Sequence, residues 1–154
     1  MNCFCELITP VAECPSSRTS SLQDKKLATG QENNLKFHYG MNIKIIDKKI
    51  AESELREIAK DFYVEMVKGV VDVEREIIAI GGEYHMDANV VLIENGSKQQ
   101  NIWGFNWYFD KSGNERIEYV SLINIRPTQG NRTMEVQDIF LRDKMKTIIL
   151  KYLS

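Results

Sequence analysis

A short stretch of the chain holds five side chains that could together bind a divalent cation. They are Asp72, Glu74, Glu83, His85 and Asp87. Carboxylates with a single imidazole suit Mg²⁺ or Mn²⁺ better than zinc, and a non-haem iron triad would need a second histidine. Alternate residues of a strand lie about 6.5–7 Å apart, so side chains on one sheet face can converge on one ion. The sequence therefore makes Asp72, Glu83, His85 and Asp87 a candidate Mg²⁺ or Mn²⁺ site.

The element that must position these side chains is a predicted β-hairpin over residues 70–87. Apolar, β-branched residues alternate with other residues on both sides of Glu74-Arg75-Glu76, which is the pattern of a strand pair. With Arg75 and Glu76 as the turn, one face is apolar and the opposite face carries the five polar side chains. Gly81-Gly82 is expected either to form a β-bulge or to lie within a continuous strand. The predicted cross-strand pairs are Val73–Ile78 and Val71–Ile80, with Tyr84 and Met86 continuing the core face.

A second polar group surrounds a loop nearer the C-terminus. The planar guanidinium of Arg126 suits a phosphate or a carboxylate, and neighbouring amide side chains supply fixed polar contacts. A small anionic ligand is one interpretation of this group. The alternative is that Arg126 pairs with Glu118 or Asp72 while the amides hold the loop in place. Both groups together form one candidate polar cleft, which consists of Asp72, Glu74, Glu83, His85, Asp87, Asn106, Asn124, Arg126, Gln129 and Asn131.

Periodic apolar residues predict two main helices. Apolar residues at helical spacing indicate a helix over 52–67, with Glu52 and Glu54 in its first turn, where negative charge suits the helix dipole. A second helix is expected over 139–153, because Asp138 is a good N-cap and the apolar residues that follow keep helical spacing.

The remaining pattern predicts short strands. Strands are expected over 43–45, 102–109 and 117–125, and the aromatic stripe Trp103, Phe105, Trp107, Phe109 is interpreted as core. Residues 89–94 are predicted as a strand before the hairpin signal Asn95-Gly96, with a short helix from Asp87 as the alternative. The order of elements predicts an α+β fold: a single curved, largely antiparallel sheet with helices over its apolar face.

Composition limits the class of protein. The chain has 154 residues, 43% of them hydrophobic and 27% charged, as expected for one soluble domain. A net charge of −2 provides no basic surface of the kind that binds nucleic acid. No apolar run reaches the roughly 18 residues of a membrane span. A signal peptide is not indicated, because the N-terminus lacks a basic region and Glu6 interrupts its apolar run, so the expected localisation is cytoplasmic.

The first 40 residues differ from the rest. They contain all three cysteines, a polar run and almost no apolar periodicity. We interpret residues 1–40 as a disordered extension and residues 41–154 as a single domain, with Met41 as an alternative translational start.

Several short motifs are distributed along residues 41–154. They are MVK at 66–68 with VDVE at 71–74, GGEYHMD at 81–87, NGS at 95–97, WGFN at 103–106, and INIRP at 123–127 with QGN at 129–131. Together these motifs resemble a family of small bacterial proteins catalogued only as a domain of unknown function. The resemblance implies a free-standing bacterial protein whose domain begins near Met41, and it brings no established activity. Asn89 and Asn95 stand where acidic residues would be expected, which weakens any scheme that needs every carboxylate.

Two functions follow from these residues. The first is a binding or regulatory module that recognises a small anionic ligand or a protein partner through the polar sheet face and the Arg126 loop. No activated Ser or Cys motif is present, and Gly81-Gly82 is not a phosphate-binding loop. The alternative is a metal-dependent phosphodiesterase or nuclease, since Asp72 followed by Glu83-x-His85 faintly resembles the restriction-endonuclease core. A charged, solvated sheet face without a ligand is the third interpretation.

Overall fold

A five-stranded antiparallel sheet forms the centre of the fold, with the strands in the order β1-β3-β2-β4-β5. The structure is a computed structural model and describes residues 42–153; the predicted extension and the alternative start at Met41 lie outside these residues. The sheet is open. Its strands are β1 (Lys44–Ile46), β2 (Met66–Asp72), β3 (Ile77–Ile80), β4 (Ile102–Tyr108) and β5 (Ile117–Glu118).

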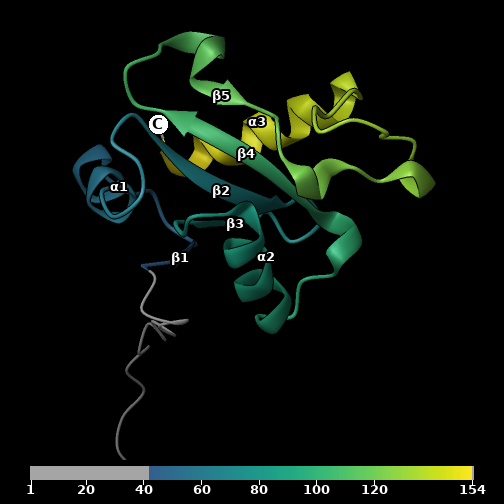
Figure 1. Ribbon diagram of the computed structural model, residues 1–154, viewed down its shortest axis with the longest axis horizontal. Coiled ribbons are helices and arrows are strands. Elements are labelled where there is room, and N and C mark those ends of the chain that lie inside the picture. The colour runs from purple at the N-terminus through teal and green to yellow at the C-terminus, as the bar shows by residue number, and fades with distance from the viewer. Residues whose placement is uncertain (1–41, 154) are drawn as a thin grey trace, which may run out of the picture. The chain divides into compact units, whose positions relative to one another are not determined.

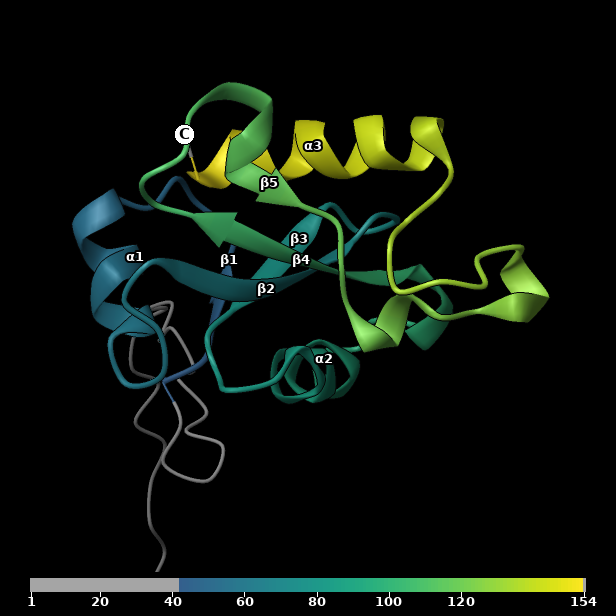
Figure 2. The same ribbon diagram turned by 45° about the horizontal axis from the view of Figure 1, so that its top comes forward.

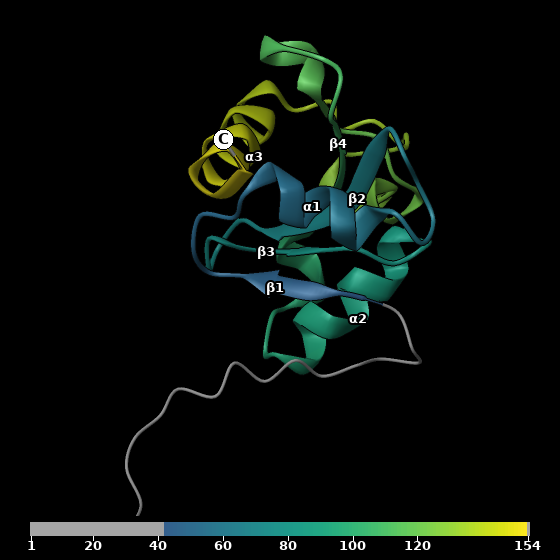
Figure 3. The ribbon, with the colours of Figure 1, turned by 90° about the vertical axis from the view of Figure 1, so that its left-hand side faces the viewer.

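Three α-helices cover the two faces of the sheet (Figure 1). They are α1 (Glu52–Ala59), α2 (His85–Glu94) and α3 (Ile139–Leu153). Helices α1 and α3 pack on one face and α2 on the other, as Figure 3 shows. The predicted α+β fold with one antiparallel sheet is confirmed. The sheet has no solvated face beneath α2, because that helix buries Val70, Ala79 and Ile102.

The larger core lies between the sheet and the helices α1 and α3. Trp103, Phe105, Trp107 and Phe109 alternate along β4 and its end, and all four are buried there. Leu55 and Ile58 of α1 and the apolar stripe of α3 close this core from outside. The interpretation of the aromatic stripe as core is confirmed, and so is α3 with its Asp138 cap. The Asp138 carboxylate accepts hydrogen bonds from the backbone N–H groups of Phe140 at 2.9 Å and Leu141 at 3.3 Å.

The β2–β3 hairpin forms in a register two residues away from the predicted one. Val71 lies opposite Ile78, not opposite Ile80. The reason is the buried Asp72, whose Oδ1 accepts hydrogen bonds from the N–H groups of Glu74 (2.9 Å) and Arg75 (3.1 Å) and so closes a longer turn. A shift of two residues keeps the side chains of β2 and β3 on their predicted faces.

The predicted strand over residues 89–94 is wrong, and the alternative, a short helix in this region, is confirmed: these residues belong to helix α2. Strand β3 ends at Ile80 because Gly81 and Gly82 take φ values of +105° and +84°, which turn the chain away from the sheet. The Tyr84 N–H then donates to the Asp87 carboxylate at 2.8 Å, and the helix begins at His85. Tyr84 and Met86 are therefore exposed and do not continue the core face of the hairpin.

Two other predicted elements are shorter than expected. The helix predicted over 52–67 ends at Ala59, and its last two predicted residues, Met66 and Val67, belong to β2. The strand predicted over 117–125 ends at Glu118, and a 3-10 helix, η3 (Leu122–Asn124), follows. The segment between β5 and α3 runs from the sheet edge toward α2 and back to the start of α3 (Figure 2).

Candidate functional site

Asp72 and His85, two of the four residues of the predicted metal site, do not lie close together. Asp72 is 0% exposed and pairs in register with Ile102 of β4. The His85 ring lies farther along the same strand, with Nε2 at 3.0 Å from the carbonyl oxygen of Phe105. Three residues of strand span about 10 Å. Both side chains are on the α2 side of the sheet, but they do not come together, because His85 begins a helix and does not continue β3.

The other predicted carboxylates are dispersed as well. Glu74 is exposed in the β2–β3 turn, Glu83 is exposed in the loop before α2, and Asp87 caps that helix. Within residues 42–153, no group of three or more His, Cys, Asp or Glu side chains is placed to hold a metal ion. The geometry therefore gives the hydrolase alternative no common site for Asp72, Glu83 and His85.

Asn124 anchors the second predicted group to the sheet. Its Oδ1 accepts from the Gly104 N–H at 2.8 Å, and its Nδ2 donates to the Gly104 carbonyl at 3.0 Å. The same Nδ2 contacts the carbonyl oxygens of Tyr119 (3.3 Å) and Met134 (3.2 Å). Asn124 is fully buried, so its amide serves backbone groups of irregular structure that have no strand partner.

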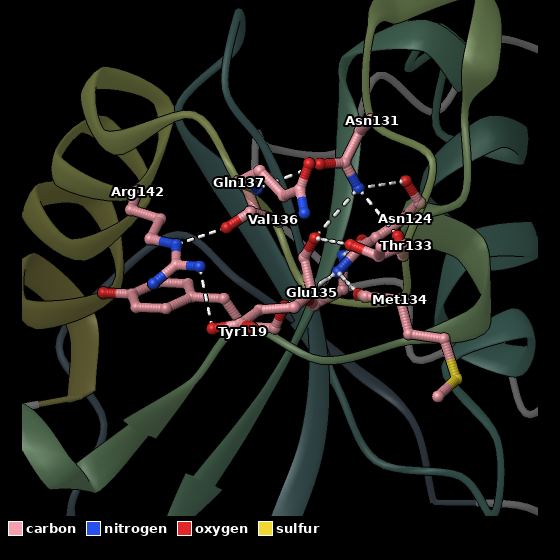
Figure 4. Close-up of polar contacts among 10 residues, drawn as sticks. Tyr119, Asn124, Asn131, Thr133, Met134, Glu135, Val136, Gln137 and Arg142 are labelled. Carbon is pink, nitrogen blue, oxygen red and sulfur yellow. Dashed lines mark hydrogen bonds and ion pairs between the residues drawn. The ribbon is translucent and has the colours of Figure 1, made fainter.

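Asn131 stabilises the part of the same loop that leads to α3. Its Nδ2 lies within hydrogen-bond distance of the carbonyl oxygens of Asn124 (2.8 Å), Thr133 (2.8 Å) and Glu135 (3.1 Å), and its Oδ1 accepts from the Gln137 N–H at 2.9 Å. Figure 4 shows both asparagine amides directed at the backbone of the segment before α3. The two amides hold the loop in place, as predicted by the alternative to a small anionic ligand.

Arg126, between these two asparagines, is half-buried over the ring of Trp103. Its Cζ lies 4.6 Å from that ring's centroid. Nε donates to the Ile123 carbonyl at 3.0 Å, Nη1 to Gln129 Oε1 at 3.3 Å, and Nη2 to the Ile102 carbonyl. Burial lowers the pKa of the guanidinium from its ordinary value. No carboxylate of residues 42–153 forms an ion pair with Arg126, so the proposed pairing with Glu118 or Asp72 does not form.

An open groove of about 620 Å³ lies beside Arg126. Met86, at the start of α2, lines it together with residues of the segment after β5. Gln129 connects this segment to the residues just before β4, because its Nε2 donates to the Gln100 carbonyl at 3.1 Å while its Oε1 accepts from Arg126. The lining side chains are Met86, Gln99, Gln100, Leu122, Ile123, Ile125, Arg126, Thr128 and Gln129.

Apolar side chains make up much of the rim of this groove. Leu122 is 72% exposed, Met86 51% and Ile125 42%. Val90 and Ile93 are also exposed and follow Met86 at i+4 and i+7 on one face of α2. None of these side chains was assigned to a site from sequence, because an apolar residue in a predicted strand is interpreted as core. The signal in the sequence was the heptad-like spacing of Met86, Val90 and Ile93.

The predicted residues His85 and Asn106 lie elsewhere, on the α2 side of the sheet beyond the helix N-terminus. Asn106 of β4 is opposite Lys68 of β2 and opposite Glu118 of β5. Lys68 and Glu118 were not among the predicted site residues, because their proximity to Asn106 depends on strand pairings that the sequence pattern does not specify. This polar row is separate from the groove at Arg126.

The fold and the groove define a small α+β protein with one open antiparallel sheet, helices on both faces and an exposed apolar groove beside a half-buried arginine. The chain belongs to the family described as "Protein of unknown function (DUF5674)", whose model matches residues 44–152. This finding confirms the resemblance of the motifs to a domain of unknown function. No curated protein and no solved structure gives a significant match to the chain. None of the helices within residues 42–153 combines the length and apolar character that a membrane span requires.

Proposed function

We propose that this protein is a partner-binding module, and that the groove at Arg126 takes an acidic protein segment that also carries apolar side chains. The observation that carries the proposal is the half-buried guanidinium of Arg126, which has no carboxylate partner within residues 42–153. A carboxylate of the partner would bind Arg126, and neighbouring apolar side chains would cover Met86, Leu122 and Ile125.

The state of Arg126 supports an anionic partner. Removing a charged group from water is unfavourable unless it is paired, yet all partners of Arg126 are neutral oxygens. A guanidinium has five N–H donors, and three are engaged, so two remain for an incoming ligand. Because the three existing hydrogen bonds and the Trp103 ring fix the side chain, a carboxylate would meet a preorganised donor and form charge-assisted hydrogen bonds.

The shape and rim of the groove support a protein segment more than a small molecule. Small-molecule sites enclose most of the ligand surface, whereas this groove is largely open to solvent. Exposed apolar patches with a polar rim are typical of protein interaction surfaces. The stripe Met86, Val90, Ile93 on α2 extends the apolar surface beyond the groove, which favours an extended or helical segment.

A peptide array in which acidic and apolar positions are varied independently would test the proposal. Trp103 reports on binding, because it lies directly under Arg126 and is one of two tryptophans in the chain. Peptides with both kinds of side chain should bind and change Trp103 fluorescence, while peptides with only one kind should not. Arg126→Gln should weaken binding about tenfold or more.

Two further variants separate binding from folding. Leu122→Asp changes a 72% exposed rim residue, so it should abolish binding of acidic peptides without affecting the stability of the domain. Arg132→Gln removes an exposed arginine of the same segment and serves as the matched control, with unchanged binding expected. Wild-type affinity in both Arg126→Gln and Leu122→Asp, or no binding across the array, would contradict the proposal.

A further inference from the structure

We infer that the protein has a second site, independent of the groove: a polar row across β2, β4 and β5 that binds a small zwitterion, an amino acid with separate ammonium and carboxylate groups. The row consists of Lys68, Asn106 and Glu118, which lie opposite one another in the strand register on the α2 side of the sheet. Neighbouring strands are about 4.8 Å apart, so Lys68 and Glu118 are separated by about 10 Å at Cα.

Lys68 is a cation held entirely by neutral groups. Its Nζ donates to the Tyr63 hydroxyl at 2.6 Å and to the Glu83 carbonyl oxygen at 3.0 Å. The same nitrogen lies 4.6 Å from the ring centroid of Tyr63 and 5.7 Å from that of Tyr84. Within the described part of the chain, no carboxylate is within ion-pair distance of Lys68. One of its three N–H donors therefore remains for an anionic ligand.

Glu118 is the corresponding anion at the other end of the row. Its Oε2 accepts hydrogen bonds from Asn106 Nδ2 at 2.8 Å and from the Tyr108 hydroxyl at 3.0 Å, and both donors are neutral. Lys111 lies over the Tyr108 ring at 3.7 Å but forms no ion pair with Glu118. Lys68 and Glu118 do not pair with each other either, because Asn106 stands between them.

The middle of the row is neutral and has an unused acceptor. Asn106 is 7% exposed, and its Oδ1 has no hydrogen-bond partner. Above it, His85 must donate from Nε2 to the Phe105 carbonyl, since a carbonyl oxygen only accepts, and its Nδ1 is then an acceptor. Burial lowers the pKa of His85 most, and the hydrogen bond to the Phe105 carbonyl raises it. Lys68 also lowers this pKa, while Asn106 and Glu118 raise it, so the ring lies close to all three residues of the row.

A zwitterion satisfies all of these groups at once. Its carboxylate would take the free donor of Lys68, and its ammonium would bind Glu118 with the orphaned Oδ1 of Asn106 as a further acceptor. An anion alone would leave Glu118 without an opposite charge and facing a like charge. A cation alone would leave Lys68 without an opposite charge and facing a like charge. The separation of the two protein charges therefore selects a ligand that carries both.

NMR titration of the full chain would test the inference, with glycine, β-alanine and γ-aminobutyrate as probes. These three compounds separate the two charges by increasing distances, and N-acetylglycine and glycinamide each lack one charge. At least one zwitterion should produce saturable shifts at the His85 ring and at the amides of Lys68 and Glu118, and the two single-charge compounds should not. Equal shifts with N-acetylglycine would overturn the inference in favour of a simple anion site.

Substitutions complete the test. Lys68→Gln and Glu118→Gln should each weaken binding about tenfold or more, while the exposed controls Lys98→Gln and Glu115→Gln should leave it unchanged. Glu118 lies on the short edge strand β5, so its variant reports on binding even if Lys68→Gln reduces stability. Wild-type affinity in Glu118→Gln, or no shift with any of the three zwitterions, would also overturn the inference.

Discussion

The side chain of Asn124 forms with the backbone of Gly104 both hydrogen bonds that a neighbouring strand would supply, at 2.8 Å to the N–H and 3.0 Å to the carbonyl. Strand β5 pairs with β4 only at Asn106 and Trp107, so the chain has already left the sheet edge at this point. The approach is close: a Cβ on Gly104 would lie 2.5 Å from Ser121 Cβ. One amide thus replaces a continuation of β5 and fixes the segment that carries Arg126.

Replacing Asn124 with Ala should therefore destabilise the protein by about 3 kcal/mol, because buried backbone groups of Gly104 and Met134 lose their partners. Urea unfolding would measure the change. Asn114→Ala is the matched control, since that exposed asparagine only accepts from Lys146, and its effect should stay within about 0.5 kcal/mol. Equal losses in the two variants would show that the amide of Asn124 does not hold the segment.

Gly81 should tolerate no side chain. Its φ is +105°, and an added Cβ would lie 2.1 Å from the carbonyl oxygen of Asn42. Gly130 has a similar φ of +84° but no atom within 4 Å of the same position. Both Ala variants incur the cost of a left-handed backbone, about 1–2 kcal/mol, and Gly81→Ala adds about 1–3 kcal/mol for the clash. Thermal unfolding of both variants would measure this difference, and equal midpoints would contradict the steric account.

Trp103 should be structural as well as a reporter of the groove. It is 5% exposed, with its ring in the larger core and its face under Arg126. Trp103→Ala should cost about 3–5 kcal/mol, the range for a large buried aromatic, while Trp103→Phe should recover most of that loss. Chemical denaturation of both variants would measure the two costs. Near-wild-type stability of Trp103→Ala would show that the ring is not part of the core.

The elements that could be predicted from the sequence are those whose signals are local. Strand β4 alternates aromatic residues at period two, and α3 combines a cap at Asp138 with helical spacing, so both formed as predicted. Helix α2 was assigned as a strand because Val90-Val91-Leu92-Ile93 is a β-branched run that is apolar on every side. Its identity is decided by Gly81 and Gly82, whose positive φ values end β3 and free the chain to begin a helix.

The candidate sites were harder to predict, because they depend on tertiary pairings. The acidic residues of 72–87 were expected on one face only if the strand continued beyond Ile80. The row Lys68–Asn106–Glu118 requires the register of three strands, two of which are far apart in sequence. Arg126 and Gln129 were identified as polar contacts, but the apolar rim around them was not, since exposure of Leu122 and Ile125 follows from the early end of β5.

His85 should titrate well below a free imidazole. Burial lowers its pKa from 6.5 to about 4, opposed by its hydrogen bond to the Phe105 carbonyl. Because the folded state disfavours the charged ring, the unfolded chain binds more protons between these two values. The contribution of His85 to stability is therefore fully present above pH 6.5 and is lost as the pH falls toward about 4. An NMR titration of the ring would measure this pKa directly, with His38→Gln used to assign the signals of the two histidines.

The matching stability measurement uses His85→Gln, whose amide can still donate to the Phe105 carbonyl but does not titrate. Urea unfolding of both proteins at about pH 7 and about pH 4.5 separates the ring from the carboxylates, whose effects are common to both. The wild type should lose more stability than His85→Gln over this interval. Parallel losses, or a ring that titrates near 6.5, would place the imidazole in water and not in its buried position above Asn106.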